Sequence, residues 1–374
     1  MKTLAIFGAT GSIGDSSLKV YKNNQSKFKL LYLSANKNYR KLKKLDNLYK
    51  PKKIILTDKK LNFIKSKIDK KIIFEKDLLK KNLKKIDYVI SGVSGYDALD
   101  LNLKLIRISK KLLLANKETI ICGGDYLKKY ASKYKCQIIP IDSEHYCINF
   151  FLKNFSQKNF KEINNFHLVA SGGPFLNKNF RYNEPIEEVV KHPNWKMGKK
   201  ISVDSSNFAN KVLELFEAKI LFNIPSNKIK ISIEQKSNVH AIIEFKNNIY
   251  LPIVHSPNML IPISGGMDVS NNIDLNFNKF KIKFTRLNLK KFPIIKLGYN
   301  ILKLNNHVAM ILFTIFNERL VKMFINNRIK YGDIANNLVK IFKSKKVSYL
   351  LKYNLRNYRD IKLVIDKANK IKIL

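Results

Sequence analysis

The feature that most constrains the fold is the glycine-spaced turn near the start of the chain. An apolar run at 4–7 leads directly into GATGSIG at 8–14, and a stretch compatible with a helix follows. Strand, glycine turn and helix in this order are typical of a dinucleotide-binding unit. The glycines let the backbone approach a pyrophosphate, which lies at the positive end of the helix. The spacing is GxxGxxG, whereas GxGxxG is commoner, so the position of the turn is the stronger signal.

The residues that follow continue this pattern to about residue 145. Short apolar runs alternate with lysine-rich, helix-compatible stretches, which predicts a mostly parallel sheet with helices on both faces. The predicted strands are 30–33, 53–56, 71–74, 88–90, 112–114 and 137–141. We therefore expect an α/β, Rossmann-like cofactor-binding domain over residues 1–145.

The remainder of the chain has a different organisation. A mixed pattern over 146–268 predicts a central α+β catalytic domain, and helical apolar spacing over 294–374 predicts a small C-terminal helical domain, with 269–293 as a linker. In the central domain we expect strands at 166–170, 229–233, 240–245 and 250–254 and a helix at about 206–222.

The turn after the second predicted strand bears on cofactor choice. NAD-binding versions usually carry Asp or Glu there for the ribose hydroxyls. This chain has Asn36, Lys37 and Asn38, with Arg40 close behind. A cationic turn without an acid favours the extra phosphate of NADP.

Two acids follow the strand predicted at 137–141. If the strand continues, Asp142 and Glu144 share a face at its carboxyl end, where open α/β sheets bind ligands. Two adjacent carboxylates favour a cation, and oxygen ligands without clustered cysteine or histidine favour Mg²⁺ or Mn²⁺ over zinc. The alternative is a surface turn with two solvated acids.

A second polar cluster lies at 200–214. If a helix begins near Ser205 or Ser206, a hydroxyl at its N-terminus could hold a phosphate monoester together with Asn210 and Lys211. Glu214 can share the helix face of Asn210 and Lys211. An N-capped surface helix with an ordinary Lys/Glu pair is the alternative. Glu217 is expected to face solvent or a neighbouring helix.

Three further segments are candidates for contacts with ligands. The loop containing Ser171 could bind phosphate or sugar, or be an ordinary turn. Trp195, the only tryptophan, lies between a proline and a glycine, as in a lid that excludes water, although packing is the alternative. Lys117 follows a predicted strand and could reach a nicotinamide or a carbonyl oxygen, or form a solvated pair with Glu118.

The formal charge of +43 raises the hypothesis of a polyanion-binding protein. Only eight of the 71 basic residues are arginines, the side chain best suited to grip phosphates, and lysines are spread along nearly the whole chain. This distribution indicates a composition bias at surface positions. Three cysteines without CxxC spacing, no apolar run long enough to span a bilayer and a strand beginning near residue 4 predict a cytoplasmic, bacterium-like protein without a targeting segment.

The motifs in this order resemble the 1-deoxy-D-xylulose 5-phosphate reductoisomerase family. Besides GATGSIG, the resemblance rests on LANKE at 114–118, DSEH at 142–145, SGGPF at 171–175, HPNWKMGKKISVDS at 192–205 and NKVLE at 210–214. SPNMLIPI at 256–263 and Asn317-Glu318 resemble the family more faintly.

The resemblance implies a function and a set of roles. The family uses NADPH and a divalent metal, Mg²⁺ or Mn²⁺, to convert 1-deoxy-D-xylulose 5-phosphate to 2-C-methyl-D-erythritol 4-phosphate for isoprenoid synthesis, as a homodimer. The implied cofactor contacts are Thr10, Gly11, Ser12, Ile13, Asn36, Lys37, Asn38, Asn116, Lys117, Glu118 and Gly198. The implied metal ligands are Asp142, Glu144 and Glu214. The implied substrate contacts are Ser143, Glu144, Ser171, His192, Trp195, Met197, Ser205, Asn210, Lys211 and Glu214. Lys117, His192 and the three metal ligands form the catalytic set.

The chain departs from the family pattern in three places. Val212 replaces a usual glycine and could crowd the site, and Glu234-Gln235 replaces a common His-Pro pair. A late glycine-rich stretch is replaced by residues 304–307. Two other functions stay open: an NADP-dependent oxidoreductase that catalyses no rearrangement, and a polyanion-binding protein with an inactive reductase fold.

Overall fold

The computed structural model describes the chain except for residues 80–83, 156–159, 196, 271–272, 274–280 and 374. The chain forms two compact units. The first contains Met1–Asn116, Leu127–Tyr146 and Asn258–Asp274, and the second contains Lys117–Tyr126, Cys147–Pro257 and Leu275–Leu374. This grouping differs from the predicted domains in three ways: residues 117–126 belong to the second unit, residues 258–268 pack with the first unit, and the C-terminal helices pack with the central part of the chain.

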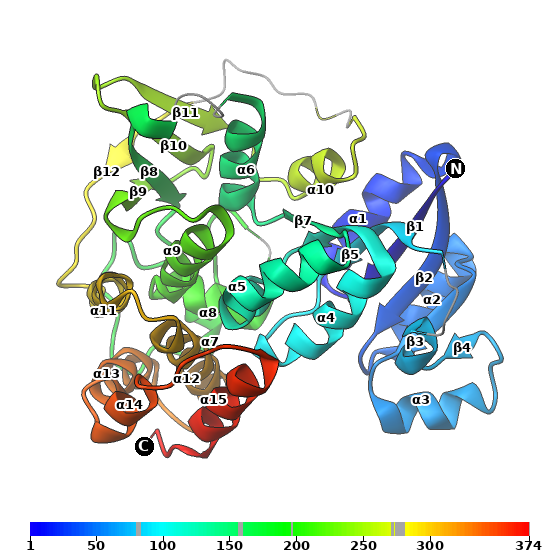
Figure 1. Cartoon of the computed structure of the whole chain (residues 1–374). Coiled ribbons are helices and arrows are strands. Elements are labelled where there is room, and N and C mark those ends of the chain that lie inside the picture. Colours follow the sequence, from blue (N-terminus) through cyan, green and yellow to red (C-terminus); the bar gives the residue numbers. More distant parts are fainter. Residues whose placement is uncertain (80–83, 156–159, 196, 271–272, 274–280, 374) are drawn as a thin grey trace. The chain divides into compact units, whose positions relative to one another are not determined.

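The first unit is built on a parallel sheet of order β4-β3-β2-β1-β5-β6-β7 (Figure 1). The strands are β1 Lys2–Phe7, β2 Phe28–Ala35, β3 Lys53–Leu56, β4 Ile72–Ile73, β5 Ile86–Ser91, β6 Ser109–Leu114 and β7 Gln137–Pro140. The strand order reverses between β1 and β5. Ligands of such sheets bind at this reversal, outside the carboxyl ends of the strands, and the glycine turn at 8–14 lies there.

Helices cover both faces of this sheet, which is why its strands are apolar in continuous runs. The helices are α1 Ser12–Lys22, α2 Tyr39–Tyr49, α3 Lys59–Ser66, α4 Leu99–Ile108, the end of α5 Lys117–Lys133, and α10 Leu260–Gly266. Helix α10 packs on α1, and its Ile263, with Met267 just beyond, belongs to the same core cluster as Leu4, Ile6 and Ile54. Helix α6, Ser143–Phe155, begins in the first unit and continues in the second.

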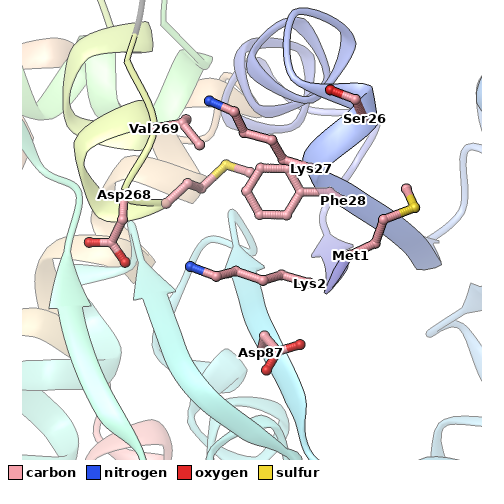
Figure 2. Close-up of a pocket in the computed structure, with 9 residues that line it drawn as sticks. Met1, Lys2, Ser26, Lys27, Phe28, Asp87, Asp268 and Val269 are labelled. Carbon is pink, nitrogen blue, oxygen red and sulfur yellow. The ribbon is translucent and has the colours of Figure 1, made fainter.

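A cavity of about 590 Å³ lies at the end of this sheet opposite the glycine turn. Figure 2 shows the ring of Phe28 within it and the charged ends of Lys2 and Asp268 nearby. Lys2 and Phe28 are the first residues of β1 and β2, so the cavity lies at the amino ends of the strands. Parallel sheets bind ligands at the carboxyl ends, so this cavity is not the predicted cofactor site.

The second unit is built on a mixed sheet of order β11-β10-β8-β9-β12. The strands are β8 Ile163–Ala170, β9 Ile229–Glu234, β10 Val239–Phe245, β11 Tyr250–Val254 and β12 Phe284–Thr285. Its helices are α7 Ile186–Val189, α8 Lys199–Ser206, α9 Ala209–Phe222, α11 Pro293–Leu304, α12 His307–Ile325, α13 Tyr331–Ile341, α14 Lys345–Leu350 and α15 Tyr358–Lys370. Helices α11 and α12 pack against α8 and α9, which explains why the C-terminal helices join this unit.

The turn that replaces the glycine-rich stretch is held by capping. Asn305 ends α11 in the left-handed conformation, and the Asn306 side chain accepts a hydrogen bond from Ala309 N at the start of α12. His307 Nε2 lies 2.6 Å from the carbonyl oxygen of Ile121 in α5. That carbonyl lies beside an interruption of α5 at Gly124 (φ 50°, ψ −139°), where an added Cβ would lie 2.1 Å from the His307 ring.

The structure also accounts for Val212. Its side chain is fully buried, and a Cβ added to Gly298 of α11 would lie 2.6 Å from both of its γ-methyl groups. Val212 therefore packs into the space that Gly298 leaves, and the expectation that it crowds the active site is wrong.

We expect Gly298→Ala to lower the free energy of unfolding by about 1–2 kcal/mol, because the clash with Val212 exceeds the helix-propensity gain of up to ~1 kcal/mol. In a Val212→Ala background the same substitution should be neutral or stabilising, since the clash is gone. Urea unfolding of the four proteins measures both effects. An equal effect of Gly298→Ala in the two backgrounds would contradict the contact.

Candidate active site

The glycine turn fits a pyrophosphate. Gly8 has φ +80°, and an added Cβ would lie 2.8 Å from the carbonyl oxygen of Gly92. An added Cβ on Gly14 would lie 2.5 Å from the backbone of Ala9, so only glycine lets α1 pack this closely on the turn. The N-cap of α1 is Gly11, which has no side chain to cover the first amides. These amides can therefore receive an anion.

The predicted adenosine-phosphate residues follow β2. Lys37 is 78% exposed, and Asn38 caps α2 by accepting from Lys41 N at 3.0 Å. Sequence reasoning missed Asp58, whose Oδ2 lies 3.9 Å from Lys37 Nζ. The other oxygen of Asp58 caps α3 by accepting from Leu61 N at 2.9 Å. An acid is therefore near this turn, but it comes from the end of β3 and serves a helix cap.

Asn116, at the end of β6, holds the loop that follows β5. Its side-chain amide donates to the carbonyl oxygens of Val93 at 2.7 Å and Gly95 at 2.9 Å. The loop lies beside the strand-order reversal, so Asn116 shapes the cofactor-binding edge of the first unit.

The prediction that Asp142 and Glu144 lie on a strand is wrong. Strand β7 ends at Pro140, and α6 begins at Ser143, with Tyr146 N donating to the Asp142 carbonyl oxygen at 2.8 Å. The Asp142 side chain bonds His145 Nδ1 at 2.9 Å, a contact that suits the turn entering a helix. Ser143 Oγ donates to Glu144 Oε2 at 2.6 Å. Both acids therefore lie at a helix N-terminus, the end that favours negative charge.

In the second unit, the first turns of α9 carry the predicted phosphate-binding face. The Asn210 amide donates to Glu214 Oε1 at 2.5 Å, and Lys211 Nζ lies 2.5 Å from Glu214 Oε2. Lys117 Nζ, from the start of α5, donates to Asn210 Oδ1 at 2.8 Å and lies 3.4 Å from Glu214 Oε1. All three charged residues are buried. One carboxylate is thus held between two ammonium groups.

The helix expected from about 206 is broken. Helix α8 ends at Ser206 and α9 begins at Ala209, because Phe208 between them adopts φ +67°. Ser205 and Ser206 therefore lie at the end of a helix, and the prediction that a helix begins near them is wrong. The glycine loop after β8 packs here, since a Cβ added to Gly173 would lie 2.8 Å from the Ser205 carbonyl oxygen. Lys211 Nζ donates to the Val169 carbonyl oxygen at 2.8 Å, so the start of α9 contacts the end of β8, two residues before Ser171.

His192 is held as a neutral donor. Its Nδ1 accepts from the backbone N–H groups of Asn194 at 3.2 Å and Trp195 at 3.1 Å, so the ring proton lies on Nε2. Nε2 then donates to Ser171 Oγ at 3.1 Å. Burial lowers the pKa of His192 from 6.5 to about 4, so the ring is neutral at physiological pH.

This pKa predicts a pH dependence of stability. Between pH 6.5 and about 4 the unfolded chain binds a proton at His192 and the folded chain does not, so the free energy of unfolding falls as pH falls through this window. Above pH 6.5 the His192 ring is neutral in both the folded and the unfolded chain, so its contribution to the free energy of unfolding no longer changes with pH. Urea unfolding at about pH 7 and about pH 5 should show a smaller loss in His192→Gln than in wild type. Equal losses would contradict the burial of the ring.

Comparison with known proteins decides the family. The profile of 1-deoxy-D-xylulose 5-phosphate reductoisomerase matches residues 4–124, and profiles of C-terminal domains of that enzyme match residues 138–222 and 254–369. The reductoisomerase of Pelagibacter ubique is 40% identical over 98% of this chain and 97% of its own, and that of Francisella tularensis is 35% identical over 97% and 95%. The chain belongs to the 1-deoxy-D-xylulose 5-phosphate reductoisomerase family. The predicted family, fold class and enzyme class are confirmed.

Solved structures agree. A crystal structure of DOX-P reductoisomerase in complex with NADPH, fosmidomycin and magnesium matches with a TM-score of 0.89 and 29% identity over 99% of this chain and 97% of that one. The reductoisomerase from Zymomonas mobilis in complex with NADPH matches with a TM-score of 0.82 and 26% identity over 99% and 96%.

The reductoisomerase motifs also build a buried charge network that sequence reasoning missed. Lys200, in the first turn of α8, contacts Glu118 and lies 2.9 Å from Asp204 Oδ2, and Asn317 donates to Asp204 Oδ1 at 2.7 Å. Burial alone would raise the pKa of Glu118, but Lys200 holds it below its ordinary value. Burial alone would lower the pKa of Lys200, but Asp204, Glu118 and Glu318 raise it. The four-residue spacing of Lys200 and Asp204 was the available signal.

Two remaining observations concern Glu217 and the membrane. Glu217 is only 1% exposed, so of the two expected surroundings, solvent or a neighbouring helix, the solvent alternative is wrong. It follows Glu214 by three residues on α9, and this spacing is the sequence signal that places it on the same buried helix face. Among the described residues, no helix is both long and apolar enough to cross a bilayer.

Proposed function

We propose that this reductoisomerase converts 1-deoxy-D-xylulose 5-phosphate to 2-C-methyl-D-erythritol 4-phosphate with NADPH and one Mg²⁺ or Mn²⁺. The observation that carries the proposal is the buried Glu214 carboxylate, held by Lys117 and Lys211 on a helix face that also carries Asn210. Simple hydride transfer needs no such array. The structural relatives in complex with NADPH and magnesium support the choice of cofactor and metal.

Asp142, Glu144 and Glu214 would hold the metal ion. The three side chains offer only hard carboxylate oxygens, the ligands that Mg²⁺ and Mn²⁺ prefer, and the ion when bound supplies a Lewis acid for the substrate's oxygens. The shared ion is supported by this donor chemistry and by the family resemblance.

NADPH, which supplies the hydride, would be held by the glycine turn of the first unit. Thr10, Gly11, Ser12 and Ile13 lie where α1 begins, and their backbone would receive the pyrophosphate. Asn36, Lys37 and Asn38 would bind the adenosine phosphate. Asn116, Lys117 and Glu118 lie between the end of β6 and the first turn of α5 and would approach the nicotinamide, with Gly198 as a further cofactor contact.

The substrate phosphate would be bound by Ser171, Ser205, Asn210 and Lys211. This grouping is supported by the contact of Lys211 with the end of β8 and by the close approach of Gly173 to Ser205. Binding energy from this remote group can hold the reacting carbons in place. Ser143 and the neutral His192 would donate to substrate oxygens, and Lys117 would stabilise negative charge that develops on them. Trp195 and Met197 would exclude water while the aldehyde intermediate exists.

The assembly and the compartment rest on the resemblance alone. We infer a homodimer in the bacterial cytoplasm that acts on a small sugar phosphate and has no specific nucleic-acid or membrane partner. Analytical ultracentrifugation at several protein concentrations tests the dimer.

Incubating the purified protein with 1-deoxy-D-xylulose 5-phosphate, NADPH and Mg²⁺ or Mn²⁺ should oxidise NADPH, as followed by absorbance. EDTA should abolish the oxidation and excess metal should restore it, because no protein group replaces the Lewis acid. The product should be 2-C-methyl-D-erythritol 4-phosphate by NMR. Oxidation that is independent of the substrate, or that survives EDTA, would contradict the proposal.

A further inference from the structure

The turn between β9 and β10 is built around a buried carboxylate. Glu234, the last residue of β9, is 1% exposed. Its Oε1 accepts from Lys236 N at 3.0 Å, and its Oε2 accepts from Asn238 N at 2.8 Å and more weakly from Val239 N at 3.4 Å. Hydrogen bonds to a charged acceptor are stronger than neutral ones, and here they cross a turn in which Ser237 adopts φ +55°. The side chain therefore fixes the conformation of residues 235–238.

This turn holds the segment that carries His192 and Trp195. The Asn194 amide donates to the Gln235 carbonyl oxygen at 2.5 Å and to Ser237 Oγ at 3.0 Å. The backbone N–H of Asn194 donates in turn to His192 Nδ1. Asn194 is thus the link between the turn and the two candidate substrate-binding residues beside it.

A second contact reaches the same segment from the start of β10. The Trp195 and His240 rings form a T-shaped pair, with centroids 6.3 Å apart and planes at 74°. The His240 ring is itself stacked on the His255 ring, with centroids 3.6 Å apart. His240 is the second residue of β10 and directly follows Val239, whose backbone N–H donates to Glu234 Oε2. Both contacts to the segment therefore depend on the backbone that Glu234 fixes.

We propose that Glu234 is a positioning residue, whose carboxylate fixes the 235–238 turn so that the turn holds Asn194 and thereby places His192 and Trp195. Its effect on the substrate rests on the proposed function, whereas its effect on Trp195 does not. The proposal accounts for the departure from His-Pro at this position. Gln235 adds links that proline cannot make, since its side chain accepts from Asn177 and donates to Thr285, each at 2.9 Å.

Because Trp195 is the only tryptophan, its fluorescence reports this placement without any assay of activity. Acrylamide quenching of selectively excited Trp195 should rise in both Glu234→Ala and Asn194→Ala. In the double variant it should rise no further, since both changes break the same link. Lys236→Ala is the matched control: its exposed side chain lies in the same turn, and the substitution keeps the backbone N–H. Trp195 in this control variant should be quenched by acrylamide to the same extent as in wild type.

Steady-state kinetics separate positioning from a purely structural role. With folding verified by circular dichroism, Glu234→Ala should raise KM for the substrate about tenfold, equivalent to about 1.4 kcal/mol, with a smaller change in KM for NADPH. Glu234→Gln keeps an acceptor oxygen and should recover part of the loss. If Glu234→Ala does not fold, Asn194→Ala and Glu234→Gln carry the test.

Unchanged Trp195 quenching in folded Glu234→Ala or, failing that, in Asn194→Ala would overturn the proposal. Raised quenching with unchanged substrate KM would overturn the role of this segment in substrate binding and leave the link to Trp195 standing. A wild-type protein inactive on 1-deoxy-D-xylulose 5-phosphate would refute the proposed function and leave the fluorescence result to decide the link.

Discussion

Glu214→Gln should lower kcat/KM for 1-deoxy-D-xylulose 5-phosphate by about 10³-fold while the protein still binds NADPH. The carboxylate lies between Lys117 and Lys211, and a neutral amide leaves both buried ammonium groups without this compensation. It also removes one of the three proposed metal ligands. NADPH oxidation measures turnover, and NADPH fluorescence measures cofactor binding, which the glycine turn of the other unit should preserve.

Glu188→Gln is the control for this experiment. Glu188 belongs to the same unit but is an exposed acid on α7, where it pairs with Lys191. Its replacement should leave kcat/KM within about twofold of wild type, as expected for an exposed pair. Turnover of Glu214→Gln within about tenfold of wild type would remove Glu214 from the mechanism.

Lys200→Met should lower the free energy of unfolding by about 3–5 kcal/mol, the usual result of removing one partner from a buried ion pair. The ammonium contacts Glu118 and Asp204, and these two carboxyl groups have exposed fractions of 8% and 1%. Without it they face each other and Glu318 in a poorly solvated space. Urea unfolding followed by circular dichroism measures the loss.

The adjacent lysine offers a matched control. Lys199 is exposed at the start of the same helix, so Lys199→Met should change the free energy of unfolding by less than about 0.5 kcal/mol. Replacing Asp204 by Asn in the Lys200→Met protein should recover part of the loss, since one buried negative charge is removed with it. A loss below about 1 kcal/mol in Lys200→Met would show that the network is not a stabilising one.

Much of the fold could be predicted because its strands are apolar runs bounded by polar residues. Strands β3 and β11 begin and end at the predicted residues. The failures are local. Pro140 ends β7 and Asp142 leads into α6, so the two-residue spacing of Asp142 and Glu144 does not reflect a continuing strand. Phe208 adopts the left-handed conformation and so divides the expected long helix. Non-glycine residues seldom adopt this conformation, and the sequence therefore gives no signal for the break.

The candidate site was predictable where it follows helix spacing and not where it depends on distant contacts. Asn210 and Glu214 are four residues apart, so a shared face follows from periodicity. Lys117 approaches Glu214 from 97 positions away, and only the tertiary fold brings them together. The buried state of Glu217 and the pairing of Lys200 with Glu118 depend in the same way on how the helices of the second unit pack.

The interleaved course of the chain has a consequence for how this protein is made. The polypeptide passes between the two units five times, and neither unit is a single stretch. Ile263 and Met267 complete a core that begins at Leu4, so the nucleotide-binding half cannot close until these late residues leave the ribosome. A fragment ending at residue 145 should remain a substrate for chaperones and proteases, and truncation cannot yield either half intact.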